Sequence, residues 1–334
     1  MKLPFSFNLR FIYRNILPGF LLSLGFFPLI NLVAKSFHIV INNEYLILIS
    51  SIIFGWFLQV IDMHIYMVYE GRRYWPKFIK KYFIRRKQRH LLKLKNRYSF
   101  ILERRNALSL EDENYNYINN EYYELSSKIR RFPVNSNGDR TAIFPTEIGN
   151  IIYSYESYTK IVYGINSIFY WNWIWMLLDK DLKEEIDSQQ GLADSTIYTS
   201  FALNFNAILM IVYGINELIR FHHLYDIGLF EINIFYGYFF LLSFIQFLIA
   251  YLIYKSSIQL HISFGSIFRA VFDAYREKIN VDHVIKTISN LTGDESYKEK
   301  DSVEKYEISW RYLKNYKIEM KGKKVSIHEL KRKG

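Results

Sequence analysis

Three polar side chains share one face of a long apolar stretch. Gln59, Asp62 and Tyr66 are spaced at i, i+3 and i+7, which places them together on one side of a helix. Polar groups inside an apolar segment are costly to bury unless they find partners or water. The spacing therefore predicts either a polar path or helix interface, or a carboxylate near the membrane surface that pairs with an arginine such as Arg14 or Arg72.

Other apolar stretches carry the residues that could complete such a path. Asn204 and Asn206 lie near the middle of one stretch, and Gln246 lies inside another. Two residues that are two positions apart are about 200° apart on a helix, so only one of the asparagines can face the path. With Gln59, Asp62 and Tyr66, these residues form the predicted pore or polar interface.

Motifs of enzyme chemistry are missing from the sequence. There is no cysteine, which excludes disulfides, thiolate metal sites and a cysteine nucleophile. There is also no nucleophile elbow, zinc-binding His-Glu-x-x-His helix or glycine-rich phosphate loop. His222, His223 and Asp226 could share a metal, but an interfacial polar loop is the favoured interpretation. We therefore expect a non-enzymatic protein without catalytic, cofactor or metal residues.

Four apolar stretches position the polar residues. They cover residues 16–34, 45–69, 196–216 and 232–254, with Pro28 inside the first. A helix rises ~1.5 Å per residue, so each stretch is long enough for the ~30 Å hydrocarbon core of a bilayer. The sequence predicts an all-α membrane protein with four transmembrane helices arranged as two hairpins.

The basic residues indicate how those helices are oriented. With spans at these places, 41 of the 43 Lys and Arg residues fall on one side, and only Lys35 and Arg220 fall on the other. Positive residues that adjoin spans remain cytoplasmic. Both termini and the segment between the hairpins are therefore expected in the cytoplasm, and anionic lipid headgroups are the expected partner for the net charge of +11.

A basic segment follows the second apolar stretch. Residues 72–97 hold twelve Lys or Arg and no acid. A long basic helix is expected over 72–105, and it should begin a helical hairpin that closes before Pro133. Aromatic residues interleaved with these charges could also hold a nucleic acid, but positive-inside charge already explains the pattern. The predicted lipid-facing basic surface comprises Arg72, Arg73, Lys77, Lys80, Lys81, Arg85 and Arg86.

An aromatic block lies between the two hairpins. Residues 168–178 contain Trp171, Trp173 and Trp175, and are too few to cross a bilayer. Two interpretations stay open. The block is either an interfacial or re-entrant helix anchored by its tryptophans, or a buried core helix of the cytoplasmic part.

A short motif precedes this block. Pro145 and Thr146 begin a helix, with Thr146 as its cap, and the motif continues Glu-Ile-Gly-Asn to Asn150 before Tyr163 and Gly164. The combination resembles a group of uncharacterised bacterial polytopic membrane proteins that carry a Pro-Thr-x-x-Gly-Asn block followed by Tyr-Gly-[Ile/Leu] in a cytoplasmic helix. The resemblance implies a bacterial inner-membrane protein and names no catalytic residue.

These observations combine into four segments. We expect a first hairpin over 1–69, a cytoplasmic helical segment over 70–195, a second hairpin over 196–254, and an amphipathic helix with a polar tail of low order over 255–334. Four spans are few for a solute path, so a homo-oligomer is expected. The favoured function is an ion-conducting or membrane-effector protein whose cytoplasmic part responds to a ligand or protein. The alternative is a membrane anchor that recruits cytoplasmic partners.

Overall fold

Helices make up nearly all of the structure, a computed structural model. It describes residues 12–38, 42–109, 111–134, 142–225, 229–279, 281–313, 318–320 and 323–325, without the side chains of 220–237 and of the last two ranges. Among these residues, four helices are long and apolar enough to cross a membrane: Ile12–Ser36, Asn43–Val60, Lys180–Ile219 and Tyr238–Lys278. The prediction of four such helices is confirmed.

Packing divides the chain into two units. Unit 1 comprises Met1–Tyr74 and Asp187–Phe264, and unit 2 comprises Trp75–Ile186 and Gly265–Gly334. Each unit combines residues from early and late in the chain. The division into four consecutive segments stays a prediction.

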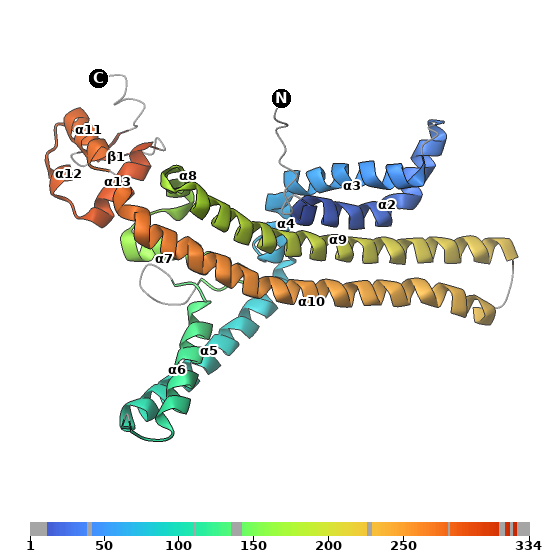
Figure 1. The fold of residues 1–334 in the computed structure, drawn as a ribbon, viewed down its shortest axis with the longest axis horizontal. Helices are drawn as coiled ribbons and strands as arrows, with labels where there is room; N and C mark the ends of the chain where they lie inside the picture. Colours follow the sequence, from blue (N-terminus) through green and yellow to red (C-terminus); the bar gives the residue numbers. More distant parts are fainter. Residues whose placement is uncertain are drawn as a thin grey trace. The chain divides into compact units, whose positions relative to one another are not determined.

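The first two apolar helices of unit 1 pack closely against each other. A short π-helical turn, Ile12–Ile16, leads into α2, Leu17–Ser36, and α3 covers Asn43–Val60 (Figure 1). A Cβ added to Gly19 would lie 2.1 Å from the Ser51 carbonyl oxygen, and one added to Gly55 would lie 2.5 Å from the Asn15 carbonyl oxygen. Small residues of this kind allow two helix backbones to approach where apolar surface alone gives no preference.

The second apolar stretch is not one continuous helix. Helix α3 ends at Val60, Ile61 leaves the helical conformation at φ −95° and ψ 10°, and α4 begins as Asp62–Tyr69. The expectation of an unbroken helix from 45 to 69 is therefore wrong. The new helix places Asp62 in its first turn, where a carboxylate interacts favourably with the positive end of the helix dipole.

Most of two long helices belongs to unit 1. Helix α9 is Lys180–Tyr225 and helix α10 is Leu229–Tyr275, while unit 1 takes residues 187–264. The two lie side by side in unit 1 (Figure 1). The Ser200 hydroxyl donates to the Ala250 carbonyl at 2.9 Å, and the Ser243 hydroxyl donates to the Ala207 carbonyl at the same distance. Serine on each helix therefore binds the backbone of the other.

A helical hairpin opens unit 2, as predicted. Helix α5 is Lys77–Ala107 and α6 is Tyr115–Arg130, and they bury Ile101, Ile118 and Leu125 between them. The basic helix begins at Lys77 rather than at residue 72, because Pro76 precedes it and Tyr74 has a positive φ of 65°.

The Pro-Thr-x-x-Gly-Asn block begins α7, Glu147–Tyr163. The Thr146 hydroxyl accepts from the Gly149 N–H at 3.0 Å, and the helix ends at Gly164 with φ 68°, both as expected. Asn150, 2% exposed, binds the preceding loop: its amide donates to the Phe144 and Thr146 carbonyls and its oxygen accepts from the Phe144 N–H. Through these hydrogen bonds the motif attaches the preceding loop to the first turn of α7.

Replacing Asn150 with alanine should lower the stability of unit 2. Three side-chain hydrogen bonds of a buried asparagine are lost, so we expect a cost of about 2 kcal/mol in the free energy of unfolding. Thermal unfolding followed by tryptophan fluorescence would measure it. Asn172→Ala, at an exposed position of the next helix, is the control. Equal unfolding midpoints for the two variants would contradict this role.

The remaining elements include an ordered C-terminal cluster. Helix α8 is Ser167–Leu177, and a 3-10 turn, Arg276–Lys278, separates α10 from α11. The sequence predicts a polar tail of low order within 255–334. Up to residue 313 this prediction is wrong, because Ile285, Ile288, Tyr297 and Tyr312 form a buried core. The last elements are α11, Asp282–Thr292; α12, Ser296–Glu299; α13, Ser302–Leu313; and the strands β1, Ile318–Met320, and β2, Lys323–Val325, which pair antiparallel.

Candidate functional site

An ion pair lies inside unit 1. Nη2 of Arg14, in the turn before α2, lies 2.8 Å from Oδ2 of Asp194 in α9. The Asp194 side chain is 5% exposed and that of Arg14 is 22% exposed. Removing two charges from water is costly, and the cost is recovered only when good geometry and further hydrogen bonds satisfy them. The Tyr66 hydroxyl supplies one such bond to Asp194, whereas Nε of Arg14 has no hydrogen-bond partner among the described residues.

Tyr66 connects this ion pair to a buried histidine. Its hydroxyl donates to Asp194 Oδ1 at 2.5 Å and lies 3.4 Å from Nε2 of His261, which is 2% exposed. The other ring nitrogen, Nδ1, lies 2.7 Å from the Ser257 carbonyl oxygen. A carbonyl only accepts, so Nδ1 carries a hydrogen and Nε2 of the neutral ring presents its lone pair to Tyr66. A proton on Nε2 would turn this contact into a donated hydrogen bond.

Two further pairs surround this chain of contacts. The Tyr198 hydroxyl donates to Asp62 Oδ1 at 2.6 Å, and the Gln59 amide donates to Asn15 Oδ1 at 2.8 Å. All three residues of the predicted polar stripe thus bind partners inside unit 1. The pairing of Asp62 with an arginine is not what the structure shows, because Asp194 binds Arg14. We call Arg14, Asp62, Tyr66, Asp194, Tyr198 and His261 the polar network.

The charges of the polar network do not balance. Asp62 and Asp194 are two carboxylates against one guanidinium, Arg14, so the network carries one negative charge while His261 is neutral. Protonation of His261 would neutralise the total. A tyrosine between a carboxylate and an imidazole is an arrangement through which a proton can pass. The network can therefore hold, exchange or pass on one proton.

The other predicted pore residues lie outside this network. The Asn204 amide donates to the Tyr69 hydroxyl at 3.3 Å, and the Asn206 amide donates to the Leu21 carbonyl at 2.5 Å. The two asparagines have different partners, as their angular separation requires. Gln246 is half-buried, and its Oε1 atom has no hydrogen-bond partner among the described residues. A single path lined by all six residues stays a prediction.

The aromatic block has an inner and an outer face. In α8, Tyr170 and Ile174 are fully buried, and the Trp171 ring stacks on Phe268 at 4.8 Å between centroids. On the outer face, Trp173 is 36% exposed and Met176 is 71% exposed. The block thus has features of both interpretations, with Trp171 packed inward and Trp175 half-buried beside it. Its contact with lipid stays a prediction.

The predicted basic surface divides by accessibility. Arg72 forms an ion pair with Glu70 and Lys80 is half-buried. The other five side chains are exposed: Arg73, Lys77, Lys81, Arg85 and Arg86. They can meet anionic headgroups, which stays a prediction. Side chains of His222 and His223, and all of Asp226, lie outside the described residues.

Sequence reasoning found one half of the polar network. Asp62, Tyr66 and Arg14 were identified by spacing or by charge, whereas Asp194 was assigned to a charged segment in water and His261 to the region after the fourth span. A lone acid at the start of an apolar run and a lone histidine within one were the available signals.

Protein-family models, curated proteins and solved structures show no match to this chain, so the family resemblance stays a prediction.

Proposed function

We propose that the protein is an oligomeric, non-enzymatic protein of a bacterial inner membrane that passes ions, with protons as the first candidate, under the control of its cytoplasmic part. The observation that carries the proposal is the polar network, which gathers two carboxylates, one guanidinium and one imidazole from apolar helices of unit 1. Ionisable groups in such helices commonly mark ion or proton pathways. Both termini would be cytoplasmic, and Arg85 and Arg86 would face anionic lipid.

The exposed apolar surface of the four helices supports a membrane location and assembly. Only 11% to 28% of the residues in their apolar windows are buried within the chain. The remaining surface must be covered by lipid or by other copies of the chain, because contiguous apolar surface of this extent is rare on soluble monomers. Four spans per copy agree with a path that several copies build together.

Proton flux into liposomes tests the proposal. The full chain would be reconstituted around a pH-sensitive dye, with its size measured in detergent. We expect a proton leak, and we expect Tyr66→Phe to slow it at least tenfold, because the variant removes only the hydroxyl between Asp194 and His261. Tyr69→Phe is the matched control, since it removes a hydroxyl of the same helix that binds Ser200 at 3.0 Å.

Two results would contradict proton passage. Equal leak from the Tyr66→Phe and Tyr69→Phe proteins would separate the flux from the polar network. Liposomes that stay tight to both protons and potassium would favour the alternative function, a membrane anchor that recruits cytoplasmic partners. The observation in favour of that alternative is the exposed basic surface of α5, where Lys81, Arg85 and Arg86 are accessible.

A further inference from the structure

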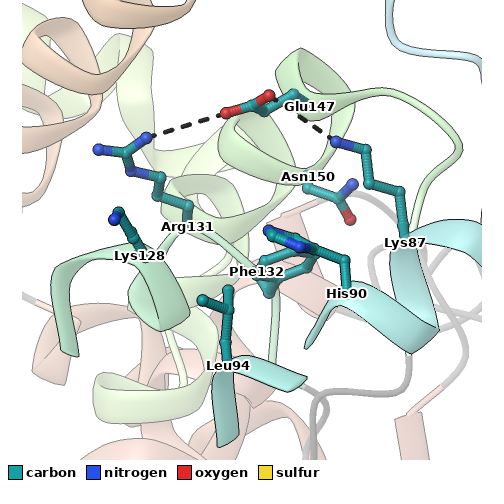
Figure 2. Close-up of a pocket in the computed structure, with 8 residues that line it drawn as sticks. All are labelled: Lys87, His90, Leu94, Lys128, Arg131, Phe132, Glu147 and Asn150. Atoms are coloured by element: carbon teal, nitrogen blue, oxygen red, sulfur yellow. Dashed lines mark ion pairs between the residues drawn. The ribbon is translucent and has the colours of Figure 1, made fainter. Parts of the chain in front are cut away.

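Unit 2 contains a small basic pocket. It lies where α5, the end of α6 and the start of α7 meet, and its volume is about 210 Å³ (Figure 2). Lys87, Lys128 and Arg131 line it, against one carboxylate, Glu147. Lys128 also forms an ion pair with Glu124 one turn away. The walls of the pocket therefore carry an excess of positive charge.

One carboxylate lies between two of these cations. Glu147 is 3.7 Å from the Lys87 ammonium and 3.8 Å from the Arg131 guanidinium (Figure 2). Both distances exceed those of a charge-assisted hydrogen bond, which are about 2.7–2.9 Å. In addition, Nε of Arg131 is buried and has no hydrogen-bond partner among the described residues. Arg131 thus keeps a donor that no described residue satisfies, beside a pocket whose described lining holds three cationic side chains and one carboxylate.

The pKa of His90 is affected by the same positive charges. Burial lowers its pKa, the nearby Lys87 lowers it further, and Lys128 and Lys93 act in the same direction, while Glu147 opposes them. Burial disfavours a charge of either sign, but the contributions of the three lysines indicate a positive potential at the ring, which favours an anion. The ring of His90 lies beside that of Phe132, with centroids 6.4 Å apart, so an apolar wall adjoins the cationic one.

We propose that this pocket binds the phosphate group of a small ligand, with Lys87 and Arg131 as the primary contacts and Glu147 as an internal competitor. Arginine suits phosphate because its planar guanidinium offers paired donors, and lysine adds a point charge. The volume is below the ~300–1,000 Å³ of pockets for drug-sized ligands, which favours a phosphate with few further atoms. A free phosphate ester and a lipid headgroup share this chemistry. Binding goes beyond the proposed function, because it does not require that unit 1 pass ions.

Phosphorus NMR of the full chain in an uncharged detergent tests binding. Inorganic phosphate is the first probe, and a short-chain phosphatidic acid in the same micelles is the second. We expect Lys87→Gln with Arg131→Gln to weaken binding about tenfold or more, because two charged hydrogen-bond donors are lost. Lys95→Gln, an exposed position on the same helix, is the matched control and should bind as the original protein does.

The Glu147→Gln variant distinguishes a ligand-binding pocket from a charged cluster that only stabilises the fold. If the carboxylate competes with the ligand, the variant should bind the probe several-fold more tightly. If the cluster only stabilises the fold, the variant should bind no better. Stronger binding of inorganic phosphate than of phosphatidic acid would indicate a free ligand, and the reverse would indicate a lipid headgroup. No binding of either probe, or equal binding by the double variant and the original protein, would overturn the proposal.

Discussion

Asp194→Ala should destabilise the protein more than any other single change to the polar network. The variant leaves the Arg14 guanidinium in a largely buried site without its carboxylate, and it removes the acceptor of the Tyr66 hydroxyl. Removing one partner of a buried ion pair costs about 3–5 kcal/mol, because the remaining charge is uncompensated. Unfolding of the detergent-solubilised protein by heat, followed by tryptophan fluorescence, would measure the loss.

A double variant tests whether the uncompensated charge causes this loss of stability. Arg14→Met combined with Asp194→Leu removes both charges, so most of the lost stability should return even though two side chains differ from the original. Asp181→Ala, at an exposed position in the first turn of the same helix, is the control and should cost less than ~1 kcal/mol. If the double variant is as unstable as Asp194→Ala, the uncompensated charge is not the reason.

Gly19→Ala should have the next largest effect. The new methyl group would meet the Ser51 carbonyl oxygen and the Gly55 backbone, neither of which can rotate away as a side chain can. The two helices would have to separate, and we expect a cost of about 3 kcal/mol or more, above the usual range for overpacking because backbone atoms are in the way. Thermal unfolding in detergent is again the measurement.

Leu24→Ala provides the comparison for this glycine. Leu24 lies on the same helix but is 45% exposed, so its truncation should change the unfolding midpoint little in detergent. The pair therefore tests a claim about geometry: adding one methyl group at a contact should be worse than removing three carbon atoms from a surface. A Gly19→Ala protein as stable as the original would show that α2 and α3 do not approach as closely as described.

Local signals predicted the helices well. The four apolar helices follow from composition and length, and the start and end of α7 follow from Thr146 and Gly164, because capping depends on residues a few positions apart. The interruption at Ile61 was not predictable in the same way. No proline or glycine marks it, and the Asp62 side chain that follows it binds Tyr198, which is 136 positions away.

The candidate site was also predictable only as far as local spacing determines it. Helical spacing brought Gln59, Asp62 and Tyr66 to one face, but spacing says nothing about which later helix packs there. Asp194 and His261 became candidates only when their distances to Tyr66 were known. The basic pocket was likewise not predictable from the sequence, because its lysines could not be told apart from the other basic residues of the segment. The structure shows that Glu147 lies near both Lys87 and Arg131.

The Arg14 ion pair also has a consequence for biosynthesis. The nearby contact of Tyr13 with Ser195 joins residues 182 positions apart, and chains grow at about 5–20 residues per second. Roughly 10–35 s therefore pass between the synthesis of Arg14 and that of its carboxylate partner. During this interval α2 and α3 can already associate through Gly19 and Gly55, but Arg14 must keep its water or headgroup contacts. Completion of the polar network is thus a late step, which depends on the synthesis of α9.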